Sequence, residues 1–539
     1  MSSMIVCPEP LAAEIGGRVL SQGGNAADAA VAAAFAQGVT NPFLCGLSGT
    51  AILLHMDEAG RSTVLNGECA IGSGPVPKAW VDTLGGRAET IGRFIVGDED
   101  NQIGPPSVMV PGFVATCWEL HRRFGSGRIA WKALLEPTIR LASDGFAVYP
   151  YIADAWSTLA DGQAAARPGY PSLKDKLDRD PAARALYLKN GTESYKVGDV
   201  LKQPAYAATL ERLATDGAED FYTGRIARVM AEDLERRKSL VRAADLADYR
   251  IVEQKALTGR HGGMELVTTP PPSPGVQILE MLAILERLGF ASLPFGEART
   301  LDLLAQVMRA GFVDNQDIKA VLIEEAEAWA SQIMQKARLD EWAARIRKGE
   351  RISGSPEKQS TGTTHLVVVD DAGSAISFTH SVGSVAGSGS VTPELGFLHN
   401  NFLGHFDPRA GRQMSILPGR RIGSGAPTVV RKAGKLRLVV GAPGGSRIIT
   451  AILQTLLHVI DHRLSADSAV AKTRIHSEEG FLVHLEPGWP EATRAQLAVL
   501  GNNVQWNRYQ ARVQAIGIDE TGRMTAGADP RGGAVATGR

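Results

Sequence analysis

The spacing of apolar and polar residues predicts a first half built largely from amphipathic helices. Apolar side chains recur at helical intervals in several segments, and Gly or Pro residues separate these segments. Asn25 is placed to cap the Ala-rich helix that follows it, and Asp144-Gly145 ends another helical pattern. We expect helices at residues 26–37, 131–143, 205–215, 225–237, 276–289, 298–312 and 324–350.

The pattern changes after residue 350. Residues 352–362 are polar and rich in Ser and Gly, which is typical of an exposed, flexible segment. Thr363-Thr-His-Leu-Val-Val-Val-Asp370 has the composition of a β-strand, and the turn residues after it predict a second strand at 375–380. A loose linker directly before a buried strand is a natural cleavage point. We therefore expect cleavage after Gly362.

Composition and charge narrow the possible functions. The 539 residues are 44% hydrophobic and 21% charged, with a formal net charge of -1. This neutral balance predicts no nucleic-acid partner and no membrane partner. The N-terminus lacks the basic and apolar stretches of a secretory signal, so we expect a soluble, cytoplasmic protein. The four cysteines are too few for a disulfide framework in a chain of this length and are expected to be small buried side chains.

The threonine at the predicted cleavage point suggests a specific chemistry. A threonine hydroxyl is a weak nucleophile, and a free α-amine with a pKa of about 7.7–8.0 can activate it as a general base. Thr363 has a free amine only after cleavage, so the mechanism requires the chain to cut itself. The products are a large subunit, residues 1–362, and a small subunit, residues 363–539, that begins with the nucleophile.

A second segment offers an oxyanion hole. Residues 436–440 predict a strand, Gly441-Ala-Pro-Gly-Gly-Ser446 follows, and residues 447–460 predict a helix. The backbone N–H groups of Gly444 and Gly445 are therefore expected to face a developing negative charge at a helix N-terminus. Two glycines before a helix are also typical of a simple turn, so this segment alone does not decide the function.

Several segments together resemble the γ-glutamyltranspeptidase family of N-terminal-nucleophile (Ntn) hydrolases. They are Gly23–Ala32, Val110–Phe113, Leu135–Phe146, Phe221–Ala227, Asp245–Tyr249, Thr363–Asp370 and Pro443–Ile449. The resemblance covers nearly the whole chain. It implies an α+β fold, a four-layer αββα sandwich formed jointly by two autocleaved subunits that remain an obligate heterodimer. It also implies catalysis on a small-molecule amide without a metal or organic cofactor.

The resemblance assigns roles to individual positions. Thr363 matches the family's nucleophile, and Ser381 matches a hydroxyl residue that supports it. Gly444 and Gly445 match the donors of the oxyanion hole. Ser424 matches the second serine of a pair that holds the substrate's α-carboxylate.

Five positions depart from the family's glutamyl-binding pattern. Gly67 replaces an arginine, Gly423 the first serine of the pair, and Gly383 an asparagine. Phe402 replaces a glutamine, and His405 replaces the aspartate that faces the substrate ammonium. Each lost charge-assisted contact costs on the order of 1.5–3 kcal/mol. Glutathione is therefore expected to be a poor substrate, and the pocket is expected to suit a smaller or more apolar acyl group.

Some alternatives stay open. Arg420 and Arg421 either supply a replacement positive charge for a carboxylate or are solvated loop residues. The activity expected first is hydrolysis of a small amide, as in oxamate amidohydrolases, or an acylase activity, as in cephalosporin acylases. A true γ-glutamyltransferase or glutathione hydrolase is the next alternative, and an inactive binding protein with the family fold is the last. His458 and His462 have helical i, i+4 spacing but no third ligand, so no metal site is expected.

Overall fold

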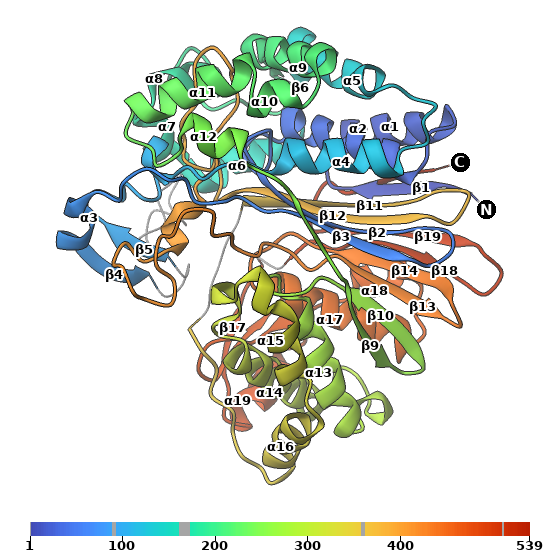
Figure 1. The fold of residues 1–539 in the computed structure, drawn as a ribbon. Helices are drawn as coiled ribbons and strands as arrows, with labels where there is room; N and C mark the ends of the chain where they lie inside the picture. The colour runs from blue at the N-terminus through green and yellow to red at the C-terminus, as the bar shows by residue number, and fades with distance from the viewer. Residues whose placement is uncertain (1, 89–92, 161–172, 357–361, 509–510, 539) are drawn as a thin grey trace.

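Two stacked β-sheets lie between two layers of helices (Figure 1). The structure is a computed structural model that describes residues 2–88, 93–160, 173–356, 362–508 and 511–538. The strand order is β20-β1-β11-β12-β2-β3-β8 in the seven-stranded sheet and β19-β18-β14-β13-β10-β9 in the six-stranded sheet. This αββα arrangement confirms the expected fold class.

Neighbouring strands in both sheets are antiparallel. The first sheet contains β20 (Val535–Gly538), β1 (Met4–Cys7), β11 (Gly362–Val369), β12 (Ala375–Gly383), β2 (Thr50–Met56), β3 (Ser62–Gly67) and β8 (Val252–Gln254). The second contains β19 (Met524–Ala528), β18 (Gln514–Ile518), β14 (Lys435–Gly441), β13 (Thr428–Lys432), β10 (Met264–Thr268) and β9 (Leu257–His261). Shorter strands are β4 (Leu84–Ala88), β5 (Arg93–Val96), β6 (Phe146–Ala147), β7 (Val200–Leu201), β15 (Ile475–His476), β16 (Leu482–Leu485) and β17 (Asn503–Trp506).

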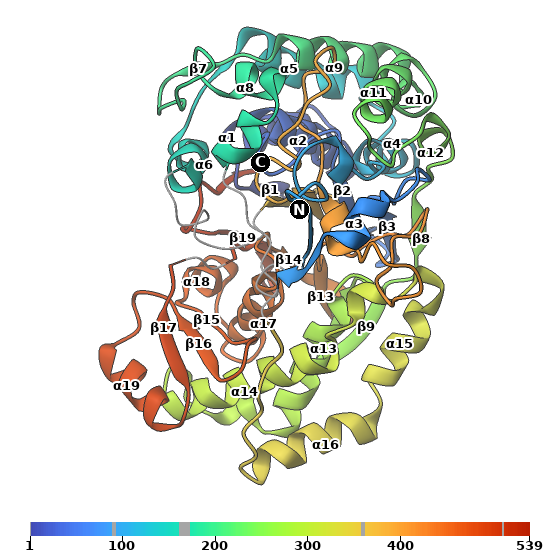
Figure 2. The same ribbon diagram turned by 90° about the vertical axis from the view of Figure 1, so that its left-hand side faces the viewer.

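Helices cover the outer face of each sheet (Figures 1 and 2). The helices over the first sheet include α1 (Pro10–Ser21), α2 (Ala26–Thr40), α4 (Phe113–Phe124), α5 (Trp131–Asp144) and α9 (Pro204–Asp216). Those over the second include α13 (Gly275–Arg287), α14 (Ala298–Asp314), α16 (Lys336–Arg347), α17 (Arg447–Ile460) and α18 (Ala466–Ala471). The others are α3 (Lys78–Asp82), α6 (Pro150–Ala160), α7 (Leu173–Asp178), α8 (Pro181–Tyr187), α10 (Glu219–Tyr222), α11 (Arg225–Arg236), α12 (Ala243–Ala247), α15 (Ala326–Ile333) and α19 (Glu491–Val499).

Strand β11 shows how the layers are joined. Leu366 and Val368 belong to the core between the first sheet and its helices, whereas Val367 and Val369 belong to the core between the two sheets. Because side chains alternate along a strand, a strand buried on both faces is apolar at nearly every position. Thr363 shares the parity of Val367, so it faces the second sheet.

Most predicted elements are present. Asn25 caps α2 by accepting hydrogen bonds from the N–H groups of Ala27 and Asp28. Helix α17 begins and ends at the predicted residues 447 and 460. The predicted helix at 324–350 is instead two helices, α15 and α16. Part of the predicted linker, residues 357–361, lies outside the described residues.

Among the residues that are described, no helix is long and apolar enough to cross a membrane.

The predicted cleavage point divides both sheets. Strand β11 begins at Gly362, β12 and β20 follow it, and β1, β2, β3 and β8 precede it. In the second sheet, β9 and β10 precede Gly362 and the other four strands follow it. Neither sheet can form from one of the two segments alone.

Candidate active site

Thr363 and Ser381 face each other across the β11–β12 pair. The Thr363 hydroxyl donates a hydrogen bond to Ser381 Oγ at 3.1 Å. Ser381 Oγ donates in turn to the carbonyl oxygen of Gly362 and accepts the N–H of Gly383 at 2.9 Å. One buried hydroxyl therefore contacts both the predicted nucleophile and the carbonyl group of the predicted scissile bond.

A buried polar network fixes the start of β11 from its other face. Thr364 Oγ1 lies 3.1 Å from Glu9 Oε1 and accepts a hydrogen bond from Gln37 Nε2 at 3.0 Å. Gln37 Oε1 lies 2.9 Å from His380 Nε2, on the neighbouring strand. Burial raises the pKa of Glu9 and lowers the pKa of His380 to about 3, so His380 is neutral. The sequence signal for this network, a glutamine inside an apolar helix, did not enter our prediction.

The glycine pair forms a turn between β14 and α17. Gly444 has a φ of 139° and Gly445 a φ of 62°, conformations that side-chain-bearing residues rarely adopt. A Cβ on Gly444 would lie only 2.7 Å from the Cβ of Ala511, so a side chain there would clash. Within the described chain, neither N–H group has a hydrogen-bond acceptor. Gly445 also lines the pocket beside Thr363, so its N–H group is available to a ligand at the start of a helix, whereas Gly444 is buried and is not among the described lining residues.

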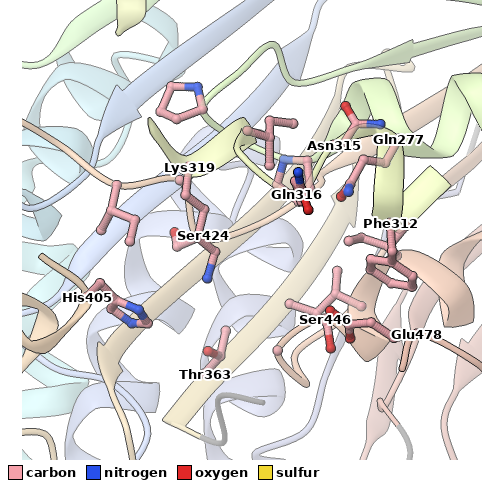
Figure 3. A pocket seen from close by; sticks show the side chains of 18 of the residues that line it. Gln277, Phe312, Asn315, Gln316, Lys319, Thr363, His405, Ser424, Ser446 and Glu478 are labelled. Carbon is pink, nitrogen blue, oxygen red and sulfur yellow. The ribbon is translucent and has the colours of Figure 1, made fainter. Parts of the chain in front are cut away.

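A pocket opens over Thr363 (Figure 3). It encloses about 820 Å³ of space without protein atoms, its open mouth included. Seven of the residues singled out in the sequence line it, namely Thr363, Ser381, Phe402, His405, Gly423, Ser424 and Gly445. A further wall was not predicted. It comes from α13, from the end of α14 and mainly from the segment that follows α14, and it contains Gln277, Phe312, Asn315, Gln316, Ile318 and Lys319. Only the fold brings that wall to the same pocket as Thr363.

Ser424 is tied to a buried carboxyl group. Its N–H and its hydroxyl both lie within hydrogen-bond distance of Glu68 Oε1, at 2.7 and 3.2 Å, and Ser273 Oγ donates to the same oxygen. Burial raises the pKa of Glu68 to about 7. Ser424, which the resemblance assigned to a substrate carboxylate, therefore contacts Glu68 through both its N–H group and its hydroxyl.

Two of the substituted glycines lie where neighbouring atoms leave no room for a side chain. A Cβ on Gly67 would lie 1.7 Å from Thr116 Oγ1, and a Cβ on Gly423 would lie 2.1 Å from the carbonyl oxygen of Pro272. Gly423 lines the pocket, but Gly67 is not among the described residues that do. The space that the family's arginine and serine side chains would need is therefore filled by Thr116 and Pro272.

Gly383 also lies where neighbouring atoms leave no room for a side chain. Its φ is 106°, and a Cβ there would lie 2.3 Å from Asn401 Oδ1. Asn401 in turn accepts a hydrogen bond from the N–H of Ser384 at 2.9 Å. Gly67 and Gly383, which the sequence placed at the substrate pocket, are thus both absent from its lining as described.

Phe402 and His405 form one side of the pocket. Both lie in a short 3₁₀ helix, η5 (Phe402–His405), and their rings stack with centroids 6.4 Å apart. His405 is 3% exposed. The family's glutamine and aspartate positions thus present two aromatic rings, and Ile422 adds an apolar side chain beside them.

Arg420 and Arg421 are directed to the backbone. Arg420 Nη2 donates to the carbonyl oxygen of Ala320 at 2.8 Å, and Arg421 Nη1 donates to that of Asn66 at 2.9 Å. Neither arginine is among the described lining residues. The lysine of the lining is Lys319, and Figure 3 shows its nitrogen directed toward Thr363 and His405, with Glu478 on the other side.

Comparison with known proteins identifies the family. The family model for gamma-glutamyltranspeptidase matches residues 12–538. The chain belongs to this family. It is 34% identical over 536 residues to the acylase ACY 1 proenzyme of Pseudomonas sp. (strain V22), and the alignment covers 97% of this chain and 91% of that protein. It is 29% identical over 553 residues to the glutathione hydrolase proenzyme of Bacillus subtilis (strain 168), with coverages of 98% and 89%.

A solved structure supports the fold. The cephalosporin acylase from Bacillus halodurans superimposes with a TM-score of 0.82 at 24% identity and covers 99% of this chain and 95% of its own. The recognised family and the expected Ntn fold are thereby confirmed. The chain is an enzyme of the class that acts on amide bonds.

Proposed function

We propose that this chain is a self-processing Ntn amidohydrolase of the acylase type, with Thr363 as its nucleophile. The observation that carries the proposal is the contact of Ser381 with both the Thr363 hydroxyl and the Gly362 carbonyl group. Gly445, whose N–H group has no acceptor within the described residues, lines the same pocket. The acylase relative, itself called a proenzyme, supports both the processing and the acyl specificity.

Self-cleavage begins in the intact chain. Thr363 Oγ1 attacks the carbonyl carbon of Gly362, and the Ser381 hydroxyl stabilises the negative charge that develops on the carbonyl oxygen. The C–N bond breaks, the Thr363 nitrogen takes up the proton of the hydroxyl, and an ester joins Gly362 to Thr363. Water then hydrolyses the ester, which leaves a carboxylate on Gly362 and a free α-amine on Thr363.

Turnover uses that amine as the general base. The amine accepts the proton of the Thr363 hydroxyl while the oxygen attacks the substrate's amide carbon. The N–H groups of Gly444 and Gly445 bind the oxyanion, and the proton passes to the departing amine. Water hydrolyses the acyl-threonine ester, releases the acid and restores the enzyme.

The pocket favours an acyl group without the glutamyl α-ammonium and α-carboxylate. His405 stands where the family has its ammonium-binding aspartate, and Glu68 holds the donors of Ser424. Loss of each charge-assisted contact costs on the order of 1.5–3 kcal/mol. Apolar side chains such as Phe402 and Ile448 line the space instead.

Glutathione hydrolysis is the second candidate, because several curated relatives carry that name. The deciding experiment is the intact mass of the denatured wild-type protein beside Thr363→Ala, followed by kcat/KM for N-acyl anilides and for glutathione. Two fragments that begin at Met1 and Thr363, an uncut variant and preference for acyl anilides support the proposal. An uncut, inactive wild type overturns it, and efficient turnover of glutathione selects the second candidate.

A further inference from the structure

A buried ammonium group joins the two segments that cleavage would separate. Lys176, on α7, is 1% exposed. Its Nζ donates to Ser384 Oγ at 2.6 Å, to the carbonyl oxygen of Val385 at 2.7 Å and to that of Gly387 at 2.6 Å. Three donors thus meet three acceptors, all in the loop that follows β12.

No carboxylate within the described chain forms an ion pair with this cation. Burial lowers the pKa of Lys176, and the nearby charge of Arg93 lowers it further, whereas Glu99 raises it. A buried charge without a counter-ion is unfavourable unless polar groups replace its hydration. Here three oxygens that converge on one point replace that hydration, so the loop is shaped around a cation.

The loop that Lys176 holds packs against the predicted scissile bond. The carbonyl group of Ser384 lies 2.4 Å from the position of a Cβ on Gly362, so only a glycine fits there. Asn401 Nδ2 also donates to Ser384 Oγ, at 2.7 Å. Ser381, which contacts the Gly362 carbonyl oxygen, lies three residues before Ser384 on the same chain segment. A shift of this loop would move Gly362 relative to its two hydroxyl partners.

We propose that Lys176 is a positioning residue for self-cleavage, whose ammonium group is a built-in cation that holds the 384–387 loop against Gly362. The inference rests on the proposed self-processing. It implies that the oxygen cage, and not the lysine stem, is the essential feature. A small monovalent cation of similar size, such as ammonium or potassium, should then replace the side chain when the stem is removed.

The test measures how fast fragments beginning at Thr363 appear in freshly purified precursor, by intact mass. The variants are Lys176→Ala, Lys176→Met and, as a matched control, Lys174→Ala on the exposed face of the same helix. Each is assayed with ammonium, potassium or tetramethylammonium chloride at equal ionic strength. Circular dichroism and thermal melting verify that each variant is folded.

We expect Lys176→Ala to slow cleavage by about 10²-fold, because small misplacements of reacting groups have effects of that size. Ammonium or potassium should restore the rate and tetramethylammonium should not. Lys176→Met, whose side chain fills the site without a charge, should be slow with every salt, and Lys174→Ala should match the wild type.

Three results would overturn the inference: normal cleavage in Lys176→Ala, normal cleavage in Lys176→Met, or a slow, folded Lys176→Ala that no cation restores. If Lys176→Ala does not fold, Lys176→Met decides alone. An uncut wild type would instead contradict the proposed function.

Discussion

The hydroxyl oxygens of Thr363 and Ser381 lie 3.1 Å apart on directly paired residues of β11 and β12. Because Ser381 also contacts the carbonyl group of Gly362, the same side chain is placed to act first in maturation and then in turnover. A residue that acted only in self-cleavage or only in turnover would change the rate of that one reaction.

Ser381→Ala should therefore slow both self-cleavage and turnover, each by about 10²-fold or more. Ser381→Thr should retain most of both rates, since it keeps the hydroxyl. Ser377→Ala, on the same face of β12 but bonded to His365 and Val440, is the control. Fragment appearance and kcat on an acyl anilide are the measurements. A loss in only one of the two rates would show that the shared role is wrong.

Gly445→Ala should reduce kcat by about 10²-fold, because the strained residue displaces an oxyanion donor. Gly434→Ala provides the control for strain alone. Gly434 has a φ of 78° at an exposed turn, and no neighbouring atom of the described residues lies within 4 Å of the position that a Cβ would take there. Equal activity of the two variants, measured by steady-state kinetics, would exclude Gly445 from the oxyanion hole.

Lys319 should determine whether an acyl carboxylate is favoured. Its side chain lines the pocket, and neither Arg420 nor Arg421 is among the described residues that do. Lys319→Met should reduce kcat/KM for glutaryl-p-nitroanilide by about 10- to 100-fold and leave the value for neutral valeryl-p-nitroanilide nearly unchanged, as expected for one charge-assisted contact. Lys435→Met, at an exposed position of β14, is the control. Equal effects of Lys319→Met on both substrates would contradict this role.

Glu68 should make stability depend on pH. Burial raises its pKa from 4.5 to about 7, so the folded chain binds a proton that the unfolded chain has released between these values. The contribution is fully present below pH 4.5 and is lost as the pH rises toward 7, by about 3 kcal/mol at most. Urea unfolding of the uncut Thr363→Ala chain between pH 5 and pH 8 measures this loss. Adding Glu68→Gln to this chain should make the free energy of unfolding less dependent on pH. If the pH dependence did not change, it would have to come from other groups.

The sequence alone was sufficient for the elements that follow one another along the chain and for the proposal of Thr363 at the start of one of them. Apolar periodicity predicted α17 to the residue, and the linker before a strand marked Thr363. The lining from α14 and the segment after it was not predictable in this way. Phe312 and Lys319 line the same pocket as Thr363 only because the chain folds, with α14 packed against α13.

The substituted glycines show a second limit. A glycine in place of a larger residue suggests open space, but Asn401 fills the space beside Gly383 and Thr116 fills that beside Gly67. Which neighbour occupies a vacated volume depends on tertiary contacts, and no local pattern records it. The same holds for Ser424, whose partner Glu68 is 356 residues away in the chain.

The order of strands has a consequence for the mature enzyme in dilute solution. After a cut before Thr363, β11 would still lie between β1 of one product and β12 of the other. Dissociation would break a ladder inside a sheet and expose two cores at once, so dilution should not separate the products on the timescale of an assay. Specific activity should stay constant down to nanomolar enzyme, and two halves expressed from separate genes should aggregate, because each alone has unpaired strand edges.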